Sequence, residues 1–287
     1  MANLKEIRSR ISSVGSTMQI TSAMKMVSAA KLKRAQDAIT QMRPYANKLT
    51  ELLVDLSSNL DVVDGGLFSE KRDLRKVLLV LITSNRGLCG GFNSYIIKQA
   101  KTLINNEYKS ANVSILSIGK KSSEHFTKNN YNVVGVYDDL FTHITYDGTC
   151  KIAEKIMEKF VEGTYDKVVL VYNQFKNAAT QIVMSENFLP IKNEEKSQES
   201  SVNYIFEPSQ DSIVEELIPR SLKTQLFKAV LDSSASEHGA RMTAMHKATD
   251  NASELKKELT LTYNKARQAA ITGEILEIVG GAEALKG

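Results

Sequence analysis

The residues best suited to chemistry lie in one short segment, residues 84–91, which reads SNRGLCGG. This segment follows an apolar run at residues 77–83 that predicts a buried strand, and a helical pattern comes after it. In a doubly wound α/β fold, a glycine-rich turn at this position can hold a phosphate group. The candidate residues are Arg86, Gly87, Cys89, Gly90 and Gly91. They match neither G-x-G-x-x-G nor the Walker lysine pattern, so a tight structural turn is the favoured interpretation.

Nucleophilic and metal chemistry find little support. Cys89 stands at a predicted helix N-terminus, where thiol pKa values fall, but no His or Asp partner is indicated nearby in the sequence. The four histidines, His125, His143, His238 and His246, have no ligand spacing, and the two cysteines form neither a disulfide framework nor a zinc site. Ser236, Glu237 and His238 are adjacent on a helix and point in different directions. We therefore predict no catalytic residue, no metal and no cofactor.

Two long helical segments flank this region. Apolar residues at the beginning of the chain repeat with 4-3 spacing, the period of a coiled coil. They are Leu4, Ile7, Ile11, Val14 and Met18, and then Ala35, Ile39, Met42, Ala46, Leu49, Leu53, Leu56 and Leu60. Between residues 20 and 33 we expect a register shift, with Ile20, Met24 and Val27 spread over a wider face.

The chain ends in a second seam, within residues 220–285, that consists mostly of small residues. Its members are Ala248, Ala252, Leu255, Leu259, Thr262, Ala266, Ala269 and Gly273. Small seam residues let two backbones approach closely, and the pattern is too long for the face of one domain. The two ends are therefore predicted to pair as an antiparallel coiled coil.

The middle of the chain alternates between strand and helix patterns. Strands are predicted at residues 77–83, 113–118, 133–136, 167–173, 181–188 and 202–206. Helical patterns lie between most of them, which implies a mostly parallel sheet with flanking helices. Residues 192–201 are polar and predict a surface loop.

Composition and charge exclude several classes of protein. The 287 residues carry a net charge of +4, no Trp and 7% aromatic residues, which suits neither nucleic-acid binding nor base stacking. Residues 1–60 contain nine Lys and Arg but four Asp and Glu, which points to an acidic partner. No apolar run approaches the roughly 20 residues that span a bilayer, and no signal peptide is visible. We expect a soluble chain in a reducing compartment, with membrane association only through partners.

Three groups of segments together resemble one family, the gamma subunit of F-type ATP synthases. They are residues 5–11, 20–34 and 43–46; residues 86–93; and residues 236–251 with 263–272 and 274–280. The resemblance implies the α/β fold class, with a long antiparallel coiled coil of the N- and C-terminal helices and a central Rossmann-like α/β domain. The expected domains are residues 1–60, 75–207 and 209–287, the last pairing with the first.

The resemblance also implies a function. A gamma subunit is the central stalk of a proton-translocating F1Fo ATP synthase, and its rotation inside an alpha3beta3 ring couples proton flow to ATP synthesis or hydrolysis on the beta subunits. The expected partners are the alpha and beta subunits, the epsilon subunit and the c-ring, with one copy of this chain per complex and no catalysis of its own. The expected place is the cytoplasmic side of a bacterial inner (plasma) membrane. The alternatives are a coiled-coil scaffold, a basic nucleic-acid-binding protein or a nucleotide-binding enzyme.

Residue roles carry over from the resemblance by position. Arg241 with Glu237, and Gln268 with Thr272, resemble polar contacts to beta-subunit loops. Ile275, Leu276, Ile278, Val279, Ala282 and Leu285 would turn against an apolar collar. Met24, Lys25, Lys31, Lys33 and Arg34 would face an acidic region of a beta subunit, and the alternative for each is a solvated helix face. Asn85 stands where many relatives carry Asp, so an ion pair that the resemblance would imply at this position is not carried over to this chain.

Overall fold

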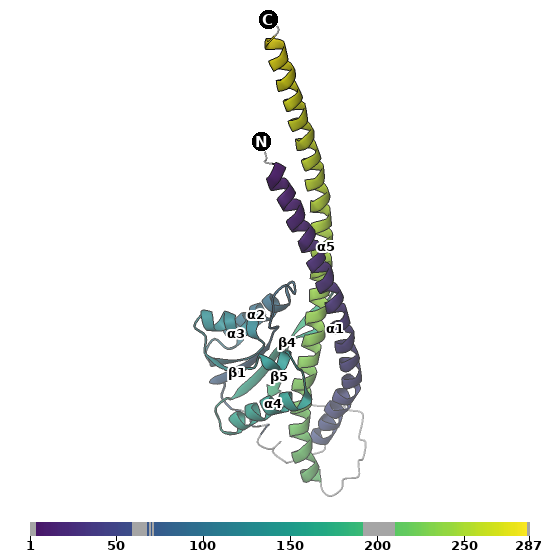
Figure 1. Cartoon of the computed structure of the whole chain (residues 1–287). Helices are drawn as coiled ribbons and strands as arrows, with labels where there is room; N and C mark the ends of the chain where they lie inside the picture. Colours follow the sequence, from purple (N-terminus) through teal and green to yellow (C-terminus); the bar gives the residue numbers. More distant parts are fainter. Residues whose placement is uncertain (1–3, 59–67, 69, 71, 192–209, 286–287) are drawn as a thin grey trace. The chain divides into compact units, whose positions relative to one another are not determined.

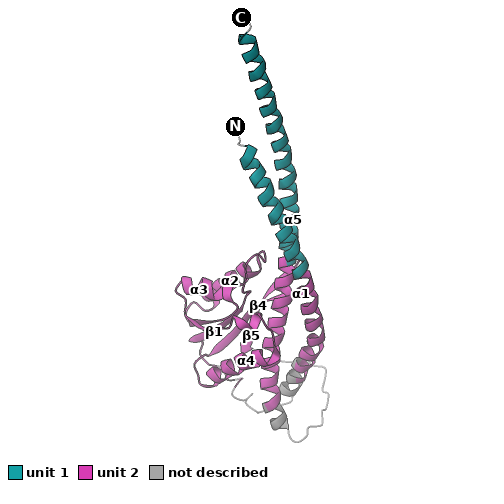
Figure 2. Ribbon diagram, viewed as in Figure 1, with its two compact units in different colours: residues 1–27, 242–287 teal, residues 28–241 magenta. Residues whose placement is uncertain are grey.

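The computed structural model describes residues 4–58, 68, 70, 72–191 and 210–285. They form two compact units, one from residues 1–27 with 242–287 (unit 1) and one from residues 28–241 (unit 2), which Figure 2 colours separately. The predicted loop at 192–201 and the predicted strand at 202–206 lie outside the described residues.

A five-stranded sheet is the centre of unit 2 (Figure 1). Its strands are β1 (Lys76–Ile82), β2 (Asn112–Ile118), β3 (Val133–Val136), β4 (Lys167–Phe175) and β5 (Gln181–Leu189). They lie in the order β3-β2-β1-β4-β5; β1 pairs in parallel with β2 and β4, β2 pairs in parallel with β3, and β5 is antiparallel to β4. The predicted mostly parallel sheet is confirmed.

Helices cover both faces of the sheet. They are α2 (Phe92–Thr102), continued by the π-helix η2 (Leu103–Glu107), α3 (Lys120–Lys128), α4 (Tyr146–Val161) and the first part of α5 (Gln210–Ala284). The 3-10 turn η3 (Asp139–Phe141) precedes α4. Side chains of β1 alternate between two cores: Leu78, Val80 and Ile82 pack with α4 and α5, whereas Val77, Leu79 and Leu81 pack mainly with α2 and α3. The unbroken apolar run of β1 is thus the mark of a strand buried on both faces.

The first helix, α1 (Leu4–Ser58), keeps one seam along the residues whose burial is described. The partly or fully buried positions include Leu4, Ile7, Ile11, Val14, Met18, Thr21, Lys25, Ser28, Leu32, Ala35, Ile39, Met42, Ala46 and Leu49. This is an unbroken 4-3 pattern, so the predicted register shift between residues 20 and 33 is wrong. Polar Thr21 and Ser28 occupy the seam, and Ile20 and Val27 are 60% and 57% exposed. The predicted members Leu53, Leu56 and Leu60 lie outside the described side chains.

Within unit 1, the ends of α1 and α5 form an antiparallel pair. The hydroxyls of Thr21 and Thr249 are 2.8 Å apart, and Gly15 lies beside the ammonium group of Lys256. Residue numbers therefore decrease along α1 in the direction in which they increase along α5, which makes the pair antiparallel. At the same rise per residue in both helices, Leu4 is level with about residue 266. Figure 2 shows α5 continuing past the beginning of α1 in this unit.

The seam of α5 differs in part from the prediction. Among residues 256–285, the partly buried positions are Lys256, Leu259, Tyr263, Ala266, Ala270 and Gly273. Ala248, Ala252, Leu259 and Ala266 are partly or fully buried as predicted, whereas Thr262 and Ala269 are exposed and Leu255 is 45% exposed. A β-carbon on Gly273 would meet nothing within 4 Å, so this position is not packed against a second helix. The predicted positions at Leu255, Thr262 and Ala269 are each one residue too early. At two of these positions the partly buried residues are Lys256 and Tyr263, long side chains with a polar end, which a count of apolar residues does not select.

Candidate functional site: the head turn and the exposed helix faces

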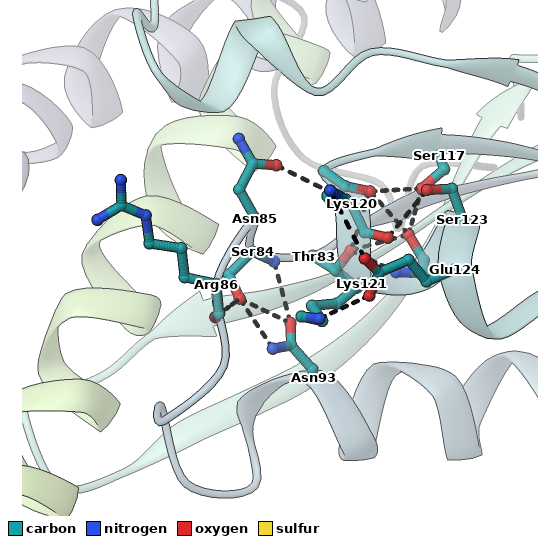
Figure 3. A network of polar contacts seen from close by, with 12 residues as sticks. Thr83, Ser84, Asn85, Arg86, Asn93, Ser117, Lys120, Lys121, Ser123 and Glu124 are labelled. Atoms are coloured by element: carbon teal, nitrogen blue, oxygen red, sulfur yellow. Dashed lines mark hydrogen bonds and ion pairs between the residues drawn. The ribbon is translucent and has the colours of Figure 1, made fainter.

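The turn between β1 and α2, residues 84–91, is held by its own polar groups; we call it the head turn. The Asn93 side chain accepts a hydrogen bond from the Ser84 amide at 3.0 Å and donates one to the Ser84 hydroxyl at 2.8 Å. That hydroxyl donates to the carbonyl oxygen of Arg86 at 2.7 Å. Figure 3 shows Ser84, Arg86 and Asn93 joined in this way, with the Arg86 guanidinium pointing away from them. The predicted strand, turn and helix are all present.

The backbone of the head turn contains two left-handed residues. Leu88 has φ 63° and Gly90 has φ 59°. Leu88 is not a glycine, so this conformation costs it about 1–2 kcal/mol, which the rest of the structure must offset. The Leu88 side chain is 67% exposed. The head turn therefore holds a strained apolar residue outward.

Cys89 lies inside the head turn and is only 2% exposed. Its sulfur accepts a hydrogen bond from the Asn93 amide at 3.2 Å. Burial raises the pKa of the thiol, which the Ser84 hydrogen bond and Arg241 offset only in part. A buried thiol with a raised pKa is a poor nucleophile, so its observed contacts support a packing role.

Beside the head turn, the carboxyl ends of β1 and β2 meet in a buried hydroxyl cluster. Thr83 and Ser122 are joined at 2.8 Å, and the Ser117 hydroxyl donates to the carbonyl oxygen of Gly119 at 2.7 Å. Asn85 bridges this region: it accepts from the Lys120 amide at 3.0 Å (Figure 3) and donates to the carbonyl oxygen of Asp138 at 2.8 Å. The amide group of Asn85 serves both contacts, whereas a carboxylate at this position has no N–H to donate.

The strand order reverses between β1 and β4, the point at which open α/β sheets bind ligands at the carboxyl ends of their strands. In this chain α5 fills that crevice. Ser233 donates to the carbonyl oxygen of Ile82 at 3.4 Å, and Ser236 donates to that of Asn173 at 3.0 Å. A β-carbon on Gly239 would be 3.2 Å from the backbone of Ala178, so helix and loop are close there. The crevice in which a phosphate would be expected beside the head turn is thus occupied by α5 itself.

Arg241 reaches from α5 to the head turn. Its guanidinium donates to the carbonyl oxygens of Gly87 and, at 3.3 Å, Arg86, and it pairs with the Glu237 carboxylate at 2.6 Å. The two side chains are 10% and 9% exposed. Burial raises the pKa of Glu237, and Arg241 partly offsets this. The structure thus brings these two predicted partner contacts together against the head turn, away from solvent.

His238 and Lys31 lie close to this pair. Burial lowers the pKa of His238 to about 4, with further contributions from Lys31 and Arg241. The imidazole is therefore neutral at physiological pH. A neutral imidazole adds no further positive charge to a region that already contains Arg241, Lys31 and Arg86.

Sequence reasoning missed a second ion pair, between α1 and α5, in which the carboxylate is buried and the guanidinium is 39% exposed. The Arg43 guanidinium lies 2.9 Å from both the Asp232 carboxylate and the carbonyl oxygen of Phe175. The Asp232 side chain is fully buried, and burial raises its pKa. A carboxylate inside the apolar pattern around residue 230 was the available signal, because a buried charge requires a partner.

The predicted partner contacts near the beginning of the chain are mostly accessible. Lys31, Lys33 and Arg34 are exposed, and Lys33 pairs with Asp37 at 2.9 Å. Met24 and Lys25 are partly buried. Within unit 1, Ile20, Met26 and Val27 are 60%, 66% and 57% exposed, and none of the three was among the predicted partner contacts.

The predicted contacts near the end of α5 are all exposed. Gln268 and Thr272 are exposed, as are Ile275, Leu276, Ile278, Val279, Ala282 and Leu285. The exposed fractions of Leu276 and Ile278 are 66% and 71%. A run of exposed large apolar side chains is typical of an interaction surface. We call residues 275–285 the apolar tip.

None of the described helices is both long enough and apolar enough to cross a bilayer. Within the same residues, no group of three or more His, Cys, Asp and Glu side chains is arranged to hold a metal ion.

The site and the sheet thus define a class: a mostly parallel α/β unit filled by its own C-terminal helix, and an antiparallel helix pair with an apolar tip. Solved structures of this class exist. The central stalk and c-ring structure of Tetrahymena thermophila mitochondrial ATP synthase contains a chain that is 27% identical, with a TM-score of 0.63 over 80% of this chain and 99% of that one. A chain of the Euglena gracilis mitochondrial ATP synthase shares the fold, with a TM-score of 0.71 at 22% identity, over 98% of this chain and 94% of that one.

Sequence comparisons identify the family. A family model described as ATP synthase matches residues 3–285. The ATP synthase gamma chain of Flavobacterium johnsoniae is 62% identical over the full length of both chains, and that of Cytophaga hutchinsonii is 52% identical over 99% of each. The chain belongs to the gamma-chain family of F-type ATP synthases. It is therefore a subunit of an ATP synthase complex.

Proposed function

We propose that this chain is the central rotor of a proton-translocating F1Fo ATP synthase. Its rotation inside an alpha3beta3 ring would couple proton flow to ATP synthesis or hydrolysis on the beta subunits. Family membership and the similarity to central-stalk structures support this function.

One observation carries the proposal: the apolar tip of α5 is uncovered. Beyond about residue 266, α1 no longer accompanies α5 in unit 1. The residues that follow include Ile275, Leu276 and Val279, which are 54%, 66% and 55% exposed. Such a surface needs a partner, and an apolar partner surface has no directional bonds that would hold one angle of rotation. A bearing requires both properties.

The coupling follows from asymmetry. One helix pair inside a ring of repeated subunits presents a different face to each copy, so each copy is stabilised in a different conformation. Turning the pair exchanges these conformations, and by reciprocity a change of conformation in the ring turns the pair. The chain needs no catalytic group for this role.

The exposed polar residues supply the contacts that vary with angle. We assign electrostatic contacts with acidic ring surfaces to Lys31, Lys33 and Arg34, supported by their exposure. Met24 and Lys25 would contribute beside the exposed Ile20–Val27 face, and Gln268 with Thr272 would hydrogen-bond to ring loops near the tip. Arg241 and Glu237 would reach the ring only by leaving their present contacts, so we treat them separately below.

Nucleotide chemistry is assigned to the partner subunits. The supporting observation is the crevice between β1 and β4, which α5 occupies through Ser233, Ser236 and Gly239. We also propose contacts with the epsilon subunit and the c-ring, one copy of the chain per complex, and a place on the cytoplasmic side of a bacterial inner membrane, reached through the complex.

Reconstitution tests the proposal. Alpha and beta subunits from the same source are assembled with and without this chain, and native mass and ATPase turnover are measured. We expect one copy per three alpha and three beta subunits, and multisite turnover that depends on the chain. If the chain remained unbound and the ATPase turnover of the ring did not depend on it, the proposal would be contradicted. The coiled-coil scaffold would then be the favoured interpretation.

A further inference from the structure

The contact between α5 and the head turn is formed by several elements of the α/β unit. Three elements converge on it: the end of β1, the loop after β4, and α5 at residues 233–241. Related open sheets keep this crevice free for a ligand. Here hydroxyls of α5 cap strand carbonyls, and a nearly buried ion pair closes the side next to the head turn.

We propose that Arg241, oriented by Glu237, is a clasp that fixes the head turn to α5, so that the turn and the helix move as one body. Arg241 is thereby a positioning residue that acts through the head turn. Only the mechanical consequence rests on the proposed rotor function: torque on α5 would pass through the clasp and β1 into the α/β unit. The clasp itself is a property of the isolated chain.

The geometry of the guanidinium carries the proposal. Its two terminal nitrogens divide their contacts: one donates to the carbonyl oxygen of Gly87, and the other donates to Arg86 and pairs with Glu237. Two adjacent carbonyls are thus held by one planar group with a fixed fork of donors. A side chain with a single charged nitrogen cannot reproduce this pattern.

The carbonyl groups that Arg241 binds lie next to the strained residue of the head turn. Gly87 immediately precedes Leu88, the residue with φ 63°. A hydrogen bond to the carbonyl of Gly87 fixes the peptide that joins the two residues, and so restricts the strained conformation of Leu88. Asn93 holds the other side of the same turn through Ser84, whose hydroxyl donates to the carbonyl of Arg86. The carbonyl oxygen of Arg86 is therefore shared by the two restraints.

The surrounding charges suit a permanent contact. Glu237 compensates Arg241 directly, and the other titratable groups near the pair include Lys31, Arg86, the Cys89 thiol and the neutral His238. Because both partners are almost fully buried, breaking the contact would leave a charge in a poorly solvated site. The clasp is thus expected to stay closed while the helix is folded.

Hydrogen exchange of the full chain tests the clasp. Arg241→Lys keeps the positive charge beside Glu237 but removes the fork, and Arg220→Lys, on an exposed part of the same helix, is the matched control. We expect exchange in a peptide covering residues 84–93 to become about 10- to 100-fold faster in Arg241→Lys. Exchange in the interiors of β1 and β4 should stay within a factor of two or so of the control if the fold is intact. Unchanged exchange in the 84–93 peptide would overturn the proposal.

A double-mutant cycle separates a clasp from a direct ring contact. Asn93→Ala loosens the head turn from its other side without touching Arg241. If Arg241 acts through the turn, the effects of Arg241→Lys and Asn93→Ala on ATP-driven proton pumping by the reconstituted complex are non-additive. Additive effects would show that Arg241 acts elsewhere and would overturn the positioning role. Chain-dependent ATPase of the wild-type assembly is read in parallel, so failure of the rotor function is distinguished from failure of the clasp.

Discussion

The partly buried His238 gives a quantitative test of the structure around the clasp. Burial lowers its pKa from 6.5 to about 4 in the folded chain, and Lys31 and Arg241 contribute to the shift. The folded state therefore binds fewer protons than the unfolded state between these two pH values. The contribution of His238 to stability is complete above pH 6.5 and is lost as the pH falls toward 4.

The magnitude follows from the two pKa values. Linkage gives a loss of about 2 kcal/mol between pH 8 and pH 5, and of about 3 kcal/mol when pH 4 is reached. Burial raises the pKa values of Asp232 and Glu237, so protonation of these carboxyls acts in the opposite direction at low pH. The informative quantity is therefore the difference in unfolding free energy between the wild-type chain and His238→Gln. Both chains contain Asp232 and Glu237, so the effect of these two carboxyls cancels in the difference.

The assay is urea unfolding of both chains at several pH values between 5 and 8, followed by circular dichroism. We expect the wild-type chain to lose about 2 kcal/mol of unfolding free energy relative to His238→Gln across this range. Histidine NMR provides a direct check: the resonance that disappears in His238→Gln should titrate near pH 4 in the wild-type chain. Parallel stability curves, together with a titration near pH 6.5, would refute the buried environment of His238.

Three further substitutions test separate parts of the account. Arg43→Met leaves the Asp232 carboxylate buried without its ion-pair partner and should lower the unfolding free energy by about 3 kcal/mol. Adding Asp232→Leu should recover most of that loss, and a loss that persists in the double variant would contradict the ion-pair explanation. Gly119 has φ 99°, and Gly119→Ala would place a β-carbon 1.9 Å from a backbone oxygen, so this change should lower the unfolding free energy in urea by at least about 2 kcal/mol. The control Gly87→Ala has open space around the new β-carbon and should lower it by less than about 1 kcal/mol. Equal losses in the two variants would refute the steric argument. Leu276→Gln, at an exposed position, should change the stability of the isolated chain by less than about 0.5 kcal/mol but weaken its assembly with the ring in a pull-down; unaltered assembly would contradict the bearing role of the tip.

The α/β unit could be predicted from local pattern because strands buried on both faces leave a distinctive signal. The run at β1 and the alternation of strands and helices were sufficient for a mostly parallel sheet. The seams of the long helices were predicted less well. Thr21 and Thr249 satisfy each other across the helix pair, so two polar residues occupy positions that an apolar count rejects. Leu255, which such a count selects, is 45% exposed.

The clasp could not be predicted from the sequence for a different reason. Arg241 donates to backbone carbonyls of residues 86 and 87, which carry no side-chain signature and lie more than 150 positions away in the chain. The sequence showed that Arg241 and Glu237 are one helical turn apart, a spacing that favours an ion pair on any helix. It could not show that the pair is buried, because burial depends on where the head turn lies.

The most direct test of the central claim is to observe rotation of this chain. Lys109→Cys, exposed and remote in sequence from the head turn, is introduced together with Cys150→Ser and labelled with a bead; Cys89 is buried. The labelled chain is assembled with alpha and beta subunits fixed to a surface, and ATP is added. The account predicts rotation in one direction, with pauses at three angles, one for each catalytic subunit of the proposed ring. A bead that remains still or moves randomly on assemblies that hydrolyse ATP at full rate would contradict it.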